Sequence, residues 1–178
     1  YLFCMPAYLT RHTHLDLAGL SHIRTYDDLL QAVAHTPYRK LLEGFPPAPG
    51  VSLNYMGVEN ALYTYLYKEV FRVIDNRTHG ENSEQLREIF ESYLDLQNYL
   101  RIVRLKFIHK ESIDVVRSSL LPFGKLHQRH LDALLDAETE EQVAAIARKT
   151  PVGKRFLKNQ GSYAYVEQLM NRTKYKTC

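Results

Sequence analysis

The sequence contains no tryptophan and only two cysteines, Cys4 and Cys178, which lie near opposite ends of the 178-residue chain. Two such distant cysteines make neither a disulfide framework nor a metal-binding pattern, and low cysteine usage suits a reducing compartment. Long apolar runs are also absent, so the sequence predicts no membrane-spanning segment. The apolar stretch Tyr1–Tyr8 lacks a basic leader and a following cleavage pattern, so we do not expect a signal peptide.

The chain has no large excess of either charge. Its 23 basic and 20 acidic residues leave a net charge of +3, and the basic residues are scattered among acids. Nucleic-acid binding requires several clustered basic contacts. Arg101 and Arg104 share a helix face, but Lys106 points elsewhere and Arg117 lies further along. The pattern favours a solvated face with salt bridges, and no nucleic acid is expected as a partner, although a nucleic-acid-binding module stays open as a third hypothesis.

Recognised catalytic motifs are absent as well: there is no Gly-rich phosphate loop, nucleophile elbow or Cys–His nucleophile pattern. Histidines occur as two close pairs, His12 with His14 and His127 with His130. An i,i+3 pair on a helix can support a metal site, but the spacing turns Asp132 away from His127 and no further ligand set accompanies the pair. We therefore expect solvent-facing histidines, no metal or cofactor, and no enzymatic activity.

Helical periodicity fills nearly the whole chain, and no stretch alternates as a strand would. The sequence therefore predicts an all-α fold of helical bundle modules, without a β-sheet. Long helices are expected over about 55–75 and 83–109, joined by a turn at Gly80 and lying antiparallel. The first carries an apolar stripe, and the second a heptad seam. The stripe is Tyr63, Leu66, Val70 and Val73; the seam is Leu86, Ile89, Tyr93, Leu96, Leu100, Val103 and Phe107.

Four threonines are predicted helix caps: Thr25, Thr36, Thr139 and Thr150. Asp28 and Gln142 follow the first and third of them in capping-box position, and a proline follows the other two. Residues 25–38 thus resemble residues 139–152. Further matches pair Tyr55 with Tyr163, Val58-Glu59 with Val166-Glu167, and Tyr67-Lys68 with Tyr175-Lys176. We interpret this as an internal repeat, with a helical lead-in (1–24), a first module (25–118) and an incomplete second module (119–178).

Polar residues also occur on the faces of the long helices. Glu59 and Asp95 could be read as an acid–base pair. However, Asn98 shares the helical face of Asp95, and Arg104 follows two and a half turns later. The pattern favours a structural polar network of Glu59, Asp95, Asn98 and Arg104 that sets how the helices register, because buried charges persist when they are paired and hydrogen-bonded.

Four segments, in order, resemble the family of C/d connector subunits of V-type and A-type rotary ATPases. They are Thr36-Pro-Tyr-Arg39, Val58-Glu59, Tyr93-Leu-Asp95-Leu-Gln-Asn98 with Arg104, and Leu121-Pro-Phe-Gly-Lys-Leu126. Members of that family are longer and are built of three modules. Val152 stands where the second module would have tyrosine, and Leu100 where the family has a basic residue.

The resemblance implies a funnel-shaped, non-catalytic helical protein that caps the membrane rotor ring and seats the foot of the central stalk. Its implied partners are the central-stalk subunits and the rotor ring, which moves protons or sodium ions. Its implied place is the cytoplasmic face of the membrane, held there through the complex. A free-standing helical protein-interaction scaffold remains the alternative.

Overall fold

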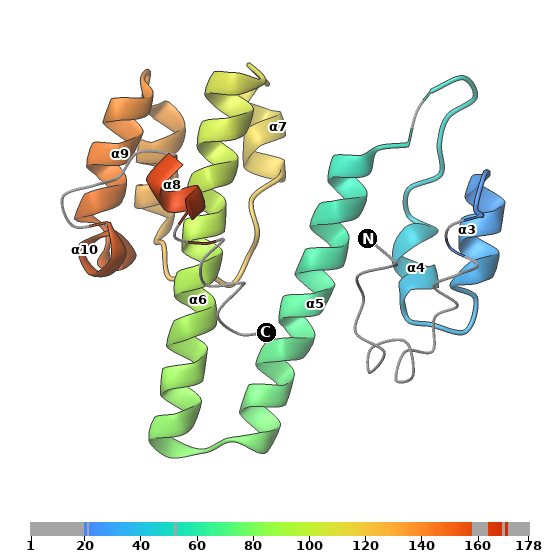
Figure 1. Ribbon diagram of the computed structural model, residues 1–178, viewed down its shortest axis with the longest axis horizontal. Coiled ribbons are helices and arrows are strands. Elements are labelled where there is room, and N and C mark those ends of the chain that lie inside the picture. The colour runs from blue at the N-terminus through green and yellow to red at the C-terminus, as the bar shows by residue number, and fades with distance from the viewer. Residues whose placement is uncertain (1–19, 21, 52, 158–163, 169, 171–178) are drawn as a thin grey trace. The chain divides into compact units, whose positions relative to one another are not determined.

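A computed structural model describes residues 20, 22–51, 53–157, 164–168 and 170, and Figure 1 shows its helices. No strand occurs among these residues, so the all-α prediction is confirmed. Two compact units, Tyr1–Leu62 and Tyr63–Cys178, meet within helix α5. Of the predicted lead-in, only residues 20 and 22–24 are described. The cysteines, His12, His14, and the repeat positions Tyr163, Tyr175 and Lys176 lie outside the described residues.

The first unit contains α3 (Tyr26–Ala32) and α4 (Tyr38–Leu42). Thr25 caps α3 in a capping box, since its hydroxyl accepts from the Asp28 N–H and the Asp28 carboxylate accepts from the Thr25 N–H. The predicted cap at Thr36 is wrong. Its hydroxyl donates to the Val33 carbonyl 2.8 Å away, and α4 begins after Pro37 without a side-chain cap. The chain turns so tightly here that the Thr36 amide also bonds to Val33, which directs the hydroxyl backwards.

The second unit is built on a helical hairpin. Helix α5 (Tyr55–Arg77) and helix α6 (Gly80–Val103) are separated by two residues and run antiparallel (Figure 1). Ring contacts and ion pairs follow this direction: Asp75 pairs with Arg87, and the Tyr67 and Tyr93 ring centroids are 6.3 Å apart. Positive φ at Gly80 lets α6 begin three residues before the predicted start.

The buried face of α5 differs from the predicted stripe. Tyr67, Phe71 and Ile74 are buried, whereas Leu66 and Val73 are about half exposed. Both sets recur at helical spacing on adjacent faces of the same helix. The sequence therefore showed an apolar side, but the packing of α6 selected which part of it is buried.

Helix α6 is buried on more than one side in its second half, because it contributes to two apolar clusters. Leu94 packs with the buried face of α5, whereas Leu96, Tyr99 and Ile102 pack with the helices that follow. The predicted heptad seam is therefore only partly buried, and Ile89 is 58% exposed. A single heptad stripe could not describe a helix that has neighbours on two sides.

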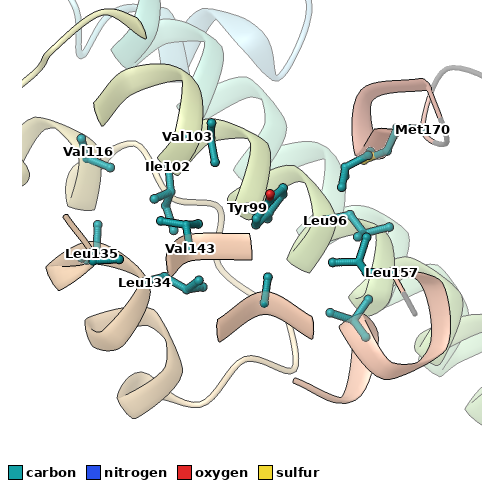
Figure 2. Packing of buried hydrophobic residues seen from close by; sticks show 14 residues of the cluster. Leu96, Tyr99, Ile102, Val103, Val116, Leu134, Leu135, Val143, Leu157 and Met170 are labelled. Carbon is teal, nitrogen blue, oxygen red and sulfur yellow. The ribbon is translucent and has the colours of Figure 1, made fainter. Parts of the chain in front are cut away.

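The remaining helices form the larger cluster with α6, and Figure 2 shows its buried side chains. They are the π-helical segment η2 (Arg104–Ile108), α7 (Ile113–Ser118), α8 (Gln128–Asp136), α9 (Glu140–Lys149) and α10 (Pro151–Phe156). Thr139 caps α9 by accepting from the Gln142 N–H, and Thr150 caps α10 by accepting from the Gly153 N–H. Because α6 packs against α8, α9 and α10, the compact units do not divide after residue 118, where the module boundary was predicted.

Candidate functional site: a polar clamp on α6

Three side chains on one face of α6 hold the backbone of the segment between α7 and α8. Asp95, Asn98 and Arg101 follow one another at three-residue spacing, which keeps them on neighbouring turns of one face. They bond in reverse order to a segment that runs antiparallel to the helix, from Ser119 to Leu126. We call these three side chains and the segment 119–126 the clamp.

Asn98 is the central member of the clamp. Its Nδ2 donates to the Leu121 carbonyl at 2.8 Å, and its Oδ1 accepts from the Leu121 N–H at 2.7 Å. Asn98 and Leu121 are both buried, so each of these backbone groups would otherwise lack water. One amide side chain therefore replaces the backbone partner that a strand or helix would have supplied.

Asp95 holds the far end of the segment. Its Oδ2 accepts from the Lys125 N–H at 3.1 Å, and its Oδ1 accepts from the Leu126 N–H at 3.2 Å. The backbone of Gly124 passes so close that a Cβ there would lie 2.1 Å from Asp95 Oδ1. Glycine at this position is therefore a requirement of the contact with the carboxylate.

Burial decides the acidity of Asp95. The residue is 1% exposed, and burial together with the nearby charge of Glu91 raises its pKa to about 6, against the two N–H bonds and Lys125, which lower it. At the rim of the clamp, Glu91 lies 3.5 Å from Lys125 Nζ and 3.6 Å from the guanidinium of Arg87. Close to neutral pH the clamp thus contains a buried carboxylate whose charge is only partly compensated.

Arg101 completes the clamp at its near end. Its Nη1 donates to the Ser119 carbonyl at 2.6 Å, and its guanidinium lies 5.6 Å from the centre of the Tyr63 ring. The sequence pattern favoured a solvated face for Arg101. The three-residue spacing from Asp95 and Asn98 was the signal that could have placed it with them.

Two of the four residues predicted to form the polar network lie apart from the clamp. The Arg104 side chain is 57% exposed and its guanidinium lies 3.9 Å from the Glu167 carboxylate. Glu59 is exposed and belongs to the first compact unit. The structure thus brings Asp95 and Asn98 together on a shared backbone segment, and it does not bring Arg104 to them.

The other basic residues considered for a nucleic-acid stripe have partners within the protein. Lys106 Nζ donates to the carbonyls of Leu135 and Ala137, at the end of α8. Arg117 forms an ion pair with Asp132 at 2.8 Å. These contacts turn the cations of this region towards protein acceptors, in agreement with the salt bridges expected from the sequence.

The histidine pair His127 and His130 lies at the start of α8, with ring centroids 5.9 Å apart. Burial and the charge of Arg129 lower the pKa of His130, and both conditions also oppose a bound cation. Within the described parts of the chain, no three His, Cys, Asp or Glu side chains are grouped as metal ligands would be.

Comparison with known families gives one match, in which the profile of the ATP synthase (C/AC39) subunit family covers residues 2–178. The chain belongs to this family. The match confirms the resemblance to the C/d connector subunits of V-type and A-type ATPases. Searches of curated proteins and of solved structures gave no match.

The clamp joins two of the segments that carry the family resemblance. Asp95 and Asn98 belong to one, and Leu121–Leu126 is another. In this member of the ATP synthase (C/AC39) family the two segments contact each other directly, through four hydrogen bonds from side chains to backbone. Among the described residues, none of the helices has both the length and the apolar character needed to cross a bilayer.

Proposed function

We propose that this protein is a non-catalytic connector that couples the central stalk of a V/A-type rotary ATPase to its ion-translocating membrane rotor ring. The observation that carries the proposal is the family match over residues 2–178. The implied partners are the stalk subunits and the ring, and the implied place is the cytoplasmic face of the membrane. The ring would carry protons or sodium ions.

The clamp supports a mechanical role. A connector under torque must keep its helices and loops in register, and the clamp fixes a loop without regular secondary structure to a long helix at three successive positions. The polar atoms of Asp95 and Asn98 bond to backbone groups, as expected of residues that hold a fold in place. Glu59 and Arg104, which lie outside the clamp, are exposed positions at which the proposed contacts with a partner can be tested.

The experiment is reconstitution of the ATPase with and without the full-length protein, with ATP hydrolysis and ion pumping measured in the same vesicles. We expect removal to leave hydrolysis by the catalytic head and to abolish pumping, and re-addition of the protein to restore it. Full coupling without the protein would exclude the connector role. Binding to neither the stalk nor the ring would instead favour a free-standing helical interaction scaffold.

Variants sharpen the test. Charge reversal at exposed Arg104 (Arg104→Glu) should weaken binding to the complex only if this surface contacts a partner. The matched control is Lys154→Glu on α10, which is also exposed. Both variants should keep the melting temperature of the isolated protein within a few degrees, so that lost coupling can be separated from lost folding.

A further inference from the structure

The segment between Leu121 and Leu126 is held at both ends and strained in the middle. Asn98 fixes Leu121, and Asp95 fixes Lys125 and Leu126. Between these anchors Phe123 has φ of 75°, in the left-handed region that bulky side chains rarely occupy. Such a conformation persists only where the surroundings impose it.

Little of the middle of this segment is buried. Phe123 is 41% exposed, and its ring contacts Phe71 with a centroid distance of 5.8 Å. Pro122 is exposed. The closed conformation therefore depends on the anchors at the ends, and chiefly on the hydrogen bonds that Asp95 and Asn98 accept.

We propose that residues 121–126 form a conformational latch on α6, closed by Asn98 and Asp95, whose opening equilibrium is set by the charge on Asp95. Opening would release Phe123 from its left-handed conformation and would admit water to the Asp95 carboxylate. The latch is an equilibrium within the isolated chain, so it does not depend on the proposed connector role.

The charged groups around Asp95 define the direction of the effect. Glu91, on the same helix, repels the carboxylate, and Lys125, on the segment itself, attracts it. From α5, Tyr67 packs in the cluster that contains Leu94 and Leu121, and burial raises its pKa so that it stays neutral. The balance of burial, hydrogen bonds and charges raises the Asp95 pKa from 3.8 to about 6 in the closed state.

The closed latch thus binds a proton more tightly than an open, hydrated carboxylate would. Acidification through pH 6 favours the closed state, and a rise towards neutral pH favours opening. With a pKa of about 6 closed and 3.8 open, the opening constant should increase about tenfold between pH 5 and pH 7.

The test is amide hydrogen exchange of the full chain, measured by NMR at pH 5 and pH 7 and corrected for the intrinsic rate. The amides of Lys125 and Leu126 should show the tenfold increase in opening constant. The Val143 amide in α9, which bonds to the Thr139 carbonyl, should not follow it and reports global opening. Equal opening constants at the two pH values for Lys125 and Leu126 would overturn the proposal.

Two variants assign the effect. Asp95→Asn should remove the pH dependence of the Lys125 and Leu126 opening constants, and a variant that keeps the full dependence would refute the role of Asp95. Glu91→Gln keeps the carboxylate and removes its like-charged neighbour, so the midpoint of the transition should move to lower pH. An unshifted midpoint in Glu91→Gln would contradict the electrostatic part of the latch, and this variant serves even where Asp95→Asn fails to fold.

Discussion

Asn98 on α6 exchanges two hydrogen bonds with the backbone of Leu121, which lies 23 positions further along the chain, and both residues are buried. The pair thus acts like a rung of a β-ladder, with an amide side chain in the place of one strand. Each bond satisfies a backbone group that no helix of this region can reach. The position of the whole 119–126 segment therefore rests on a single side chain at its centre.

Asn98→Ala should lower the free energy of unfolding by about 2–4 kcal/mol, because it leaves a buried N–H and a buried carbonyl of Leu121 without a partner. The measurement is urea unfolding followed by circular dichroism. Gln97→Ala is the matched control on the same turn of α6. Gln97 bonds only to the Tyr93 hydroxyl, so its loss should have a smaller effect. Equal losses in the two variants would argue against the special role of Asn98.

Gly124→Ala should destabilise the protein by about 1–3 kcal/mol, because the added Cβ would overlap with the Asp95 carboxylate. The two residues should also be coupled. In an Asp95→Ala background the overlapping oxygen is gone, so the same Gly124→Ala change should be nearly neutral. A double-mutant cycle by urea unfolding measures this coupling. Additive effects would show that Gly124 is required for a reason other than its contact with Asp95.

The stability of the fold should depend on pH through Asp95. Its pKa is raised from 3.8 to about 6, so protonation of Asp95 stabilises the folded state. This contribution is fully present below about pH 3.8 and is lost as the pH rises through 6, leaving a cost of about 3 kcal/mol at neutral pH. Asp95→Asn cannot ionise and keeps an acceptor oxygen.

Urea unfolding of wild type and Asp95→Asn at pH 4.5, 6 and 7.5 checks this prediction. The stability of the variant relative to wild type should increase with pH over this range. Parallel pH profiles for the two proteins would show that the Asp95 pKa is not raised in the fold, and that the two backbone N–H bonds outweigh burial.

Lys106→Met should lower the free energy of unfolding by about 1–3 kcal/mol, since Lys106 donates to the carbonyls of Leu135 and Ala137 at the end of α8. Methionine keeps most of the aliphatic length but cannot donate a hydrogen bond. Lys154→Met on the exposed side of α10 is the control and should change stability little. Thermal unfolding compares the two, and a similar melting temperature would mean that the Lys106 contacts are not important for stability.

Local chemistry let the sequence predict much of this fold. Hydrophobic spacing located the two long helices, and the threonines before α3, α9 and α10 marked where those helices begin. Thr36 has the same local signature as Thr150, yet only Thr150 accepts from the amide ahead of it. Cap prediction failed at Thr36 because the turn between α3 and α4 is tighter than the sequence indicates. The internal repeat itself remains a prediction.

The face that each helix buries was decided by tertiary packing. On α5, Leu66 and Phe71 are both apolar, and the docking of α6 buried Phe71 and left Leu66 half exposed. On α6, Ile89 fits a heptad seam, but the neighbours of α6 lie on two other sides at that level. Periodicity gives the apolar part of a helix surface, and it cannot give the direction of the partners.

By itself, the sequence determined the helical class, the positions of most helix starts, and the ordered motifs that carry the family resemblance. Only the tertiary structure showed that Asp95 and Asn98 bind the Leu121–Leu126 segment and that Arg104 lies apart from them. Hydrogen bonds between residues more than 20 positions apart depend on how helices pack. That packing is a property of the whole core, and the helical spacing of a single segment does not contain it.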